Sequence, residues 1–282
     1  MLFHRHTRAD TRKSCLAAVT LSASPATALP SGAAPCTGGT SWAPPALHCG
    51  LATSTGLRHA ENEDSFCAAG SVYVVADGMG GHQCGAQAAR AVTESLGLLA
   101  GRTDVSDDDI RDCVLAARTR MGQIPFDSGK APGSTLSGLL VTYDRPASAA
   151  YWTVMNLGDS RTYLLDSDAL TQLTTDHSVV QEMVDAGALS PQEARTHRFA
   201  YALTHAVQQH DNHAVDISRL PMQPGDRVMV CSDGISGPLD NDTLAELLRD
   251  HRDPQAAADA LVAAARVAGG TDDATVLVID AA

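Results

Sequence analysis

The sequence predicts an α+β fold in which antiparallel β-sheets are covered by pairs of helices. Strand-like segments follow one another along the chain, and helix-like segments also come in neighbouring pairs. The clearest examples are the strand-like segments 135–143, 151–156 and 161–165 and the helix-like segments 83–100 and 106–121. A doubly wound fold would instead alternate strands and helices one by one, so antiparallel sheets with helix pairs fit the order better.

The first elements are a buried strand and two amphipathic helices. Residues 72–76 form a continuous apolar run, which is typical of a strand that is buried on both faces. Apolar residues recur at helical spacing over 83–100, so one face of this helix is expected to pack on the core. Ser106, with Asp109 three residues later, is typical of a capping box and starts a second helix.

The later elements are predicted by similar signals. The loop around Gly158 predicts a hairpin between strands 151–156 and 161–165. Ser178 and Ser190 begin two short helices, and the second has a proline at its first position and a glutamate at its third. A strand at 226–231, helices at 243–250 and 254–269, and a buried strand at 275–279 complete the expected order.

The composition indicates a soluble globular protein and excludes some classes of partner. The chain has 282 residues, is 44% hydrophobic and carries a formal net charge of -13. That charge argues against nucleic acid or an anionic membrane as the primary partner, and no apolar run reaches the ~20 residues of a membrane-spanning helix. The seven cysteines include no C-x-x-C pair, so we expect reduced thiols in a cytoplasmic protein.

The first 45 residues differ in composition from the rest. They begin with basic residues and continue rich in Ala, Ser, Thr and Pro. Arg12-Lys13 precede a short apolar stretch, as in a signal peptide, but Ser and Thr dilute that stretch. We therefore expect 1–45 to be a disordered extension, or the product of a start codon set too far upstream, and 46–282 to be the folded domain.

Three aspartates at predicted strand ends indicate a metal site. Asp77 ends the strand 72–76 and precedes Gly78, whose backbone carbonyl is unshielded, while Asp233 and Asp272 come at two other strand ends. One Asp-Gly alone is most often a turn, but three such acids can converge on Mg²⁺ or Mn²⁺, which prefer oxygen ligands. Two ions that share a carboxylate lower the pKa of a water between them, as phosphate hydrolysis requires.

A charged loop just upstream supplies further candidates. Arg58 can bind a phosphate through two hydrogen bonds, and Glu63 and Asp64 can hold metal-bound waters. Taken alone, this segment would be an ordinary charged loop.

Six short segments together carry a family resemblance. They are Asn62-Glu63-Asp64, 75–82 (VADGMGGH), 133–136 (GSTL), 157–161 (LGDSR), 232–235 (SDGI) and 269–275 (GGTDDAT). In this order, over residues 50–280, they resemble the metal-dependent protein serine/threonine phosphatases of the PPM type (the 2C class) in their bacterial form. The resemblance implies an αββα sandwich, in which two antiparallel sheets pack face to face and helix pairs flank them, as the catalytic domain at 46–282.

The resemblance also implies the metal ligands. Asp77 would bridge two Mn²⁺ or Mg²⁺ ions, with the Gly78 carbonyl on one of them. Asp233 and Asp272 would complete the other. Asp159 resembles the ligand of a third, weaker metal that it would share with Asp233.

The implied activity is hydrolysis of phosphoserine and phosphothreonine by direct attack of a metal-bridging hydroxide, without a phosphoenzyme. Arg58 would bind the phosphate, and Glu63 and Asp64 would act directly or through water. Ser160 and Arg161 are expected to be structural. The expected partners are phosphorylated Ser/Thr proteins, including a bacterial Ser/Thr kinase and its substrates, for a protein that is a monomer by default.

The chain departs from the family pattern at three places. His59 holds the usual place of the phosphate-binding arginine, and we assign that role to Arg58 because a loop can absorb a shift of one residue. Met79 stands where eukaryotic relatives have a general-acid histidine, which leaves His82 or a metal-bound water as alternatives. The last motif reads Asp272-Asp273 in place of Asp-Asn; the spacing assigns the ligand to the first aspartate, and the second adds charge.

Two alternatives remain at this stage. A pseudophosphatase that binds phosphoproteins without turnover would lack a metal aspartate, and none is missing here. A two-metal phosphohydrolase for small molecules would share the metal site but not the full set of motifs. The histidines of the segment 176–209, which resembles the helical flap of bacterial relatives, do not repeat as H-x-x-x-H, and this argues against a second metal site there.

Overall fold

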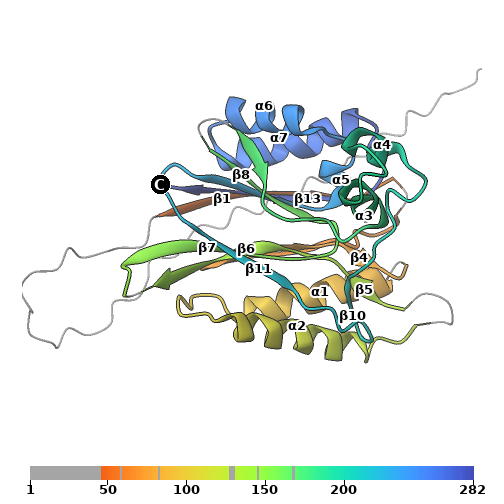
Figure 1. Cartoon of the computed structure of the whole chain (residues 1–282), viewed down its shortest axis with the longest axis horizontal. Helices are drawn as coiled ribbons and strands as arrows, with labels where there is room; N and C mark the ends of the chain where they lie inside the picture. Colours follow the sequence, from red (N-terminus) through yellow and green to blue (C-terminus); the bar gives the residue numbers. More distant parts are fainter. Residues whose placement is uncertain (1–45, 58, 82, 127–130, 145, 167–168) are drawn as a thin grey trace, which may run out of the picture.

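The protein folds into two face-to-face antiparallel β-sheets, each covered on its outer side by two helices (Figure 1). The structure is a computed structural model that describes residues 46–282, apart from 58, 82, 127–130, 145 and 167–168. The predicted αββα sandwich is therefore confirmed. The expected extension at 1–45 lies outside the described residues.

The first sheet has the strand order β11-β7-β6-β3-β2 and carries the helices α1 and α2. Its elements are β2 (Ser65–Ala69), β3 (Val72–Ala76), β6 (Leu136–Asp144), β7 (Ala149–Leu157), β11 (Asp216–Pro221), α1 (Gln83–Gly97) and α2 (Asp107–Met121). The predicted capping box is present, because the Ser106 side chain accepts a hydrogen bond from the backbone of Asp109 and the Asp109 side chain accepts one from Ser106.

The second sheet has the strand order β1-β13-β12-β8-β9 and carries the helices α6 and α7. Its elements are β1 (Leu47–Ser54), β8 (Arg161–Leu165), β9 (Leu170–Gln172), β12 (Arg227–Cys231), β13 (Ala274–Ala281), α6 (Asn241–Asp250) and α7 (Pro254–Val267). Smaller elements gather at one end of the sandwich. They are the three-stranded sheet of β4 (Gly78–Met79), β5 (Gly133–Ser134) and β10 (Val207–Gln208), and the helices α3 (Val179–Asp185), α4 (Pro191–Thr196) and α5 (Asp233–Ser236).

The core has three apolar layers, and the strand period of two residues explains them. Val72 and Val74 of β3 pack in the layer under α1 and α2, whereas Tyr73 and Val75 pack between the two sheets. A strand with both faces buried needs apolar residues at every position. This is why the apolar run at 72–76 contains no polar residue.

The predicted hairpin between 151–156 and 161–165 is wrong. The strand β7 pairs with β6 and β11 in the first sheet, whereas β8 pairs with β12 and β9 in the second. The chain crosses between the sheets at Gly158, which has φ 115°, a value that favours glycine. A short glycine loop between two strand-like runs is typical of a hairpin, and local spacing cannot tell pairing in one sheet from crossing to another.

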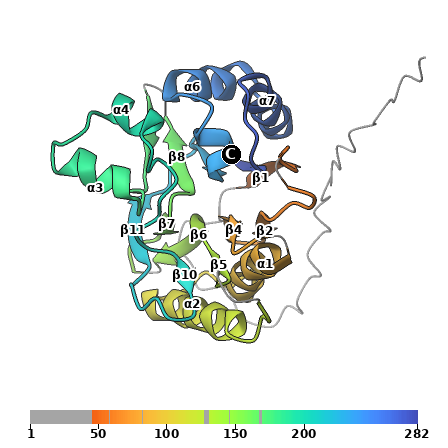
Figure 2. The ribbon, with the colours of Figure 1, turned by 90° about the vertical axis from the view of Figure 1, so that its right-hand side faces the viewer.

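The crossing matters because it places Asp159 between the two sheets, at the end where α3, α4 and α5 gather. Figure 2 shows α3 and α4 projecting to one side of the sandwich at this end. Within the described part of the chain, no helix has both the length and the apolar character to cross a lipid bilayer.

Candidate metal centre and active site

Acidic residues from distant parts of the chain meet in one cleft at this end of the sandwich. The cleft has a volume of about 860 Å³. Its wall includes Glu63, Asp77, Asp159, Asp233 and Asp272, together with Gly78. The structure therefore brings together all six predicted metal ligands.

The strand ends place these acids. Asp77 follows β3 directly, and its backbone N–H donates to Thr135 Oγ1 at 2.9 Å, while its carbonyl accepts from the Thr135 N–H at 2.9 Å. Asp233 follows β12 and opens the short helix α5, which the sequence prediction missed. Asp272 lies just before β13, which pairs with β12, so the two acids come from neighbouring strands.

Two glycines, Gly78 and Gly85, let the start of helix α1 lie close to the Asp77-Gly78 segment and to Glu63. A Cβ atom on Gly78 would lie 2.2 Å from the Gly85 carbonyl oxygen, and a Cβ atom on Gly85 would lie 2.1 Å from Glu63 Oε2. Both distances are far below van der Waals contact, so only glycine fits without a shift. The start of α1 therefore helps to hold Glu63 and the Gly78 carbonyl in place.

The carboxylates of the cleft are partly buried and lie among like charges. Burial raises the pKa of Asp77 well above its ordinary range, and the charges of four neighbouring aspartates add to this effect. Burial and the charge of Asp233 do the same to the pKa of Asp159. Burial and the charge of Asp272 also raise the pKa of Asp233. Such a crowd of acids is unfavourable unless protons or cations neutralise it.

Divalent cations fit this set of residues. The Oδ1 atoms of Asp64 and Asp233 are buried and have no hydrogen-bond partner among the described residues. Buried polar atoms are normally paired, so these two oxygens are available for a cation. The donors are all oxygens, which Mn²⁺ and Mg²⁺ prefer. The other carboxylate oxygen of Asp64 accepts a hydrogen bond from Ser232 Oγ at 2.8 Å.

His59 and Asp273 form a contact that the sequence prediction missed. His59 lines the cleft, and its Nδ1 lies 2.9 Å from Asp273 Oδ2 and 3.6 Å from Asp272 Oδ1. Burial acts against protonation of His59, but the hydrogen bond to Asp273 and the nearby acidic charges outweigh it, so the pKa of His59 is raised. The acidic neighbours therefore favour the protonated form of His59 beside Asp272. Arg58 and His82 lie outside the described residues.

Asp273 also organises the loop that carries Glu63. Only 2% of Asp273 is exposed, and its carboxylate accepts hydrogen bonds from the backbone N–H groups of Gly56 (2.6 Å) and Glu63 (2.7 Å) as well as from His59. The Asp273 carboxylate is thus engaged in hydrogen bonds inside the protein. Its expected effect on metal affinity would act through the position of Glu63.

Replacing Asp273 by Ala should lower the free energy of unfolding by about 2–4 kcal/mol, because buried N–H groups lose their acceptor. Asp273→Asn is the matched control, since its single amide oxygen can still accept from one of the two backbone N–H groups, and it should therefore cost less than Ala. Urea denaturation of the two variants and the wild type measures both effects. Equal stabilities for the two variants would contradict this role.

Replacing Gly85 by Ala should weaken the affinity for Mn²⁺ by about 10–100-fold, the usual effect of disturbing a residue that positions a ligand. The new methyl group would displace the Glu63 carboxylate, while the helix itself would gain about 1 kcal/mol of intrinsic propensity. Gly97→Ala, in the same helix, is the control. Its Cβ atom would make only an ordinary van der Waals contact, because its nearest neighbour, Cys67 Sγ, would lie 3.4 Å away. Calorimetric titration with Mn²⁺ compares the two, and equal affinities would exclude the positioning role.

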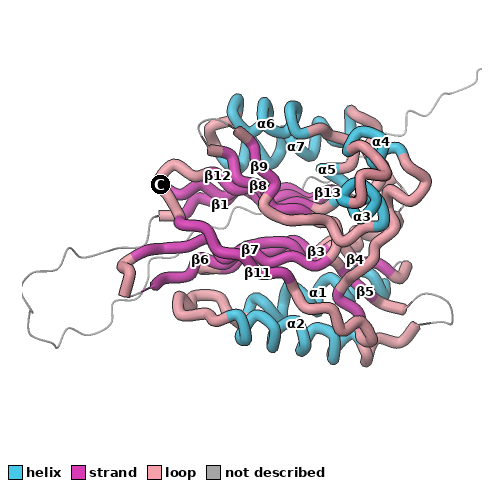
Figure 3. Tube along the Cα trace, in the orientation of Figure 1, coloured by secondary structure: helices cyan, strands magenta, loops and turns pink. Residues whose placement is uncertain are grey.

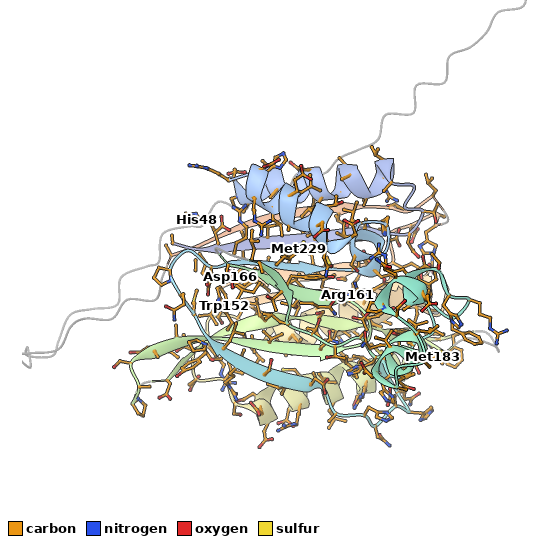
Figure 4. The ribbon with its side chains drawn as sticks, turned by 45° about the horizontal axis from the view of Figure 1, so that its top comes forward. His48, Trp152, Arg161, Asp166, Met183 and Met229 are labelled. Carbon is orange, nitrogen blue, oxygen red and sulfur yellow. The ribbon has the colours of Figure 1, made fainter. Side chains whose placement is uncertain are left out.

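The predicted structural roles of Ser160 and Arg161 agree with their contacts. Ser160 Oγ lies 2.7 Å from Thr135 Oγ1. The Arg161 guanidinium binds both carboxylate oxygens of Asp176, with distances of 2.6 Å and 2.9 Å. Figure 4 shows Arg161 beside the flap helices α3 and α4. This ion pair fastens β8 to the start of the flap, and the later part of the flap lines the cleft.

Comparisons with known proteins agree with this fold and cleft. A family model described as "Protein phosphatase 2C" matches residues 58–266. The chain is 34% identical to the serine/threonine protein phosphatase PstP of Mycobacterium tuberculosis over 237 residues, which cover 80% of this chain and 43% of that protein. It therefore spans less than half the length of this relative. It is 29% identical to the serine/threonine phosphatase stp of Listeria innocua over 257 residues, which cover 83% of this chain and 96% of that protein.

Solved structures give the same result. The crystal structure of M. tuberculosis PstP matches with a TM-score of 0.75 at 31% identity, covering 83% of this chain and 98% of that one. The PPM Ser-Thr phosphatase MsPP of Mycobacterium smegmatis, in complex with cacodylate, matches with a TM-score of 0.74 at 32% identity. The match covers 85% of this chain and 100% of that one. The PstP catalytic domain in complex with two manganese ions matches with a TM-score of 0.72 at 31% identity, covering 83% and 97%.

Proposed function

The chain belongs to the protein phosphatase 2C family, and from this membership we propose that it is a metal-dependent protein phosphatase that hydrolyses phosphoserine and phosphothreonine. The observation that carries the proposal is the convergence of five acidic side chains on one cleft. A buried carboxylate oxygen of Asp233, which lines the cleft, and one of Asp64, next to Glu63 in the chain, have no partner among the described residues. The relative with two manganese ions supports Mn²⁺ or Mg²⁺ as the cofactor.

We assign the metal ligands as follows. Asp77, Gly78 (through its carbonyl), Asp233 and Asp272 would hold two ions, and Asp159 and Asp233 would hold a third. Glu63 and Asp64 support them directly or through water. When bound, such ions neutralise phosphate charge and lower the pKa of the attacking water.

The protein residues position the substrate and the acids. Thr135 fixes the backbone at Asp77, the helix α1 holds Glu63, and Asp273 holds the loop that leads to Glu63. Arg58 remains our assignment for the phosphate-binding residue. His59, the next residue, lines the cleft and contacts Asp273. Catalysis of phosphoryl transfer by such a site rests on positioning and on charge neutralisation.

The proposed substrates are phosphorylated proteins, as the names of the relatives suggest. A bacterial Ser/Thr kinase and its targets are the partners that we propose for a monomeric, cytoplasmic enzyme. The net charge of -13 fits substrates that are not themselves strongly acidic around the phosphorylated residue.

Hydrolysis of a phosphothreonine peptide and of p-nitrophenyl phosphate by the full chain tests the proposal. Turnover should require Mn²⁺ or Mg²⁺ and stop in EDTA. Peptide binding without turnover in either metal would indicate a phosphoprotein-binding module instead. A strong preference for small phosphate esters over phosphopeptides would indicate a small-molecule phosphohydrolase.

A further inference from the structure

The flap side of the cleft carries a cluster of metal-ligand side chains that is separate from the aspartate centre. It consists of His205, Asp211 and His213, and one ligand atom of each lies within 4.8 Å of the others. His205 and Asp211 also line the cleft. Figure 3 shows that the segment between α4 and β11, which contains all three, is mostly loop with the short strand β10 inside it.

The carboxylate of this cluster is held in place. Asp211 Oδ2 accepts a hydrogen bond from the backbone N–H of Ala206 at 3.0 Å, and Oδ1 accepts one from the backbone N–H of His213 at 2.9 Å. The His213 ring lies against the same oxygen, with Nδ1 at 2.6 Å. Such outer contacts orient a ligand before a metal arrives.

His205 has a buried nitrogen with no partner. Its Nδ1 atom forms no hydrogen bond with any described residue, although buried polar atoms are normally paired. The ring packs at 5.7 Å against His177 and at 3.3 Å against His213, measured between ring centroids. His177 itself is engaged on both nitrogens, by the Gly158 N–H at 3.1 Å and by Asp216 at 3.1 Å. His177 therefore supports the His205 ring and is not one of the ligands.

Contrary to the expectation from histidine spacing, we propose that His205, Asp211 and His213 bind one transition-metal ion of the Zn²⁺ type, with an open coordination position toward the cleft. Two imidazoles and one carboxylate suit Zn²⁺, whereas the oxygen-only aspartate centre suits Mn²⁺ and Mg²⁺. The His213 side chain is 58% exposed, so its ring can turn from the stacked position to meet an ion.

The charges around the cluster set the affinity. Arg118 of α2 faces it and donates to the His213 carbonyl oxygen at 2.6 Å, so its positive charge works against a cation. The site is therefore expected to be weaker than a structural zinc site with four protein ligands.

A bound ion would act on the cleft through the backbone. The segment that carries His205 continues into β10, which pairs with β5, and β5 pairs with β4, which contains Gly78. An ion that joins His205 to His213 would thus fix the strand that borders the aspartate centre. This inference concerns metal binding and does not depend on phosphatase activity.

Co²⁺ binding to the full chain tests the proposal, because Co²⁺ absorbs visible light more strongly in a four-coordinate nitrogen and oxygen site than in a six-coordinate oxygen site. The protein is first saturated with Mg²⁺ to fill the aspartate centre, and Co²⁺ is then titrated. The wild type should bind one strongly absorbing equivalent, and Zn²⁺ should displace it. His205→Ala and His213→Ala should lose that equivalent.

His210→Ala is the matched control, because His210 is exposed and lies in the same segment but outside the cluster. It should behave as the wild type. His213→Gln changes an exposed position and should fold normally. It should also lose the strongly absorbing equivalent, and this loss would then not come from misfolding. Circular dichroism checks the fold of every variant. Equal Co²⁺ absorption in all the proteins, or a loss in His210→Ala as well, would overturn the proposal.

Discussion

Replacing Asp77 by Asn should lower the metal-dependent kcat/KM by about 10³-fold or more, which corresponds to about 4 kcal/mol of transition-state stabilisation. Asn has the shape of Asp but no charge, and the charges of four neighbouring aspartates act on Asp77. The fold should survive, because the substitution removes one of several mutually repelling buried charges. Steady-state hydrolysis of a phosphothreonine peptide over a range of Mn²⁺ concentrations measures the loss.

The control for this variant is Asp112→Asn, which removes an equal charge from an exposed position on α2. It should retain wild-type activity. If Asp77→Asn retained activity within about tenfold of the wild type, the metal assignment would be wrong. If it regained activity at high Mn²⁺ concentration, the role of Asp77 would be affinity for the ion and not the chemistry that follows.

The positions of the acids proposed as metal ligands could be predicted from the sequence because each acid has a local signal. Asp77 directly follows a buried apolar strand, Asp233 follows another after one serine, and Asp272 follows a glycine turn just before a third. Their meeting in one cleft then depends only on β12 and β13 being neighbours and on both sheets ending at the same side. For the same reason the layers of helices and strands could be predicted, since periodicity and caps are local properties.

The features that the prediction missed are contacts between segments far apart in the chain. His59 and Asp273 each appeared as a separate departure from the family pattern, yet they are hydrogen-bonded to one another across 214 positions of sequence. Spacing alone could not show this pairing. The crossing at Gly158 was missed because a short loop has the same residue types whether the next strand pairs in the same sheet or in the opposite one.

The metal-free protein should become less stable as the pH rises from about 4 to about 7, by on the order of 2–4 kcal/mol. Burial first, and then neighbouring aspartates, raise the pKa of Asp64 to about 7 and that of Asp233 to about 6, whereas an unfolded aspartate titrates near 3.9. Between these values the folded state binds more protons than the unfolded state, so the free energy of unfolding falls as protons are lost.

Mn²⁺ should reverse this dependence, because the ion replaces the protons that the crowded carboxylates otherwise need. At about 100 times its dissociation constant, a ligand of the folded state stabilises it by about 2.7 kcal/mol, and the gain should be largest above pH 7, where protons no longer compete. Urea denaturation at several pH values, in EDTA and in Mn²⁺, measures both slopes. The Asp64→Asn variant should show a shallower slope in EDTA, since one raised pKa is gone. A metal-free protein as stable at pH 7.5 as at pH 5 would mean that the acids of the cleft do not repel one another, and the charge argument for a metal centre would fail with it.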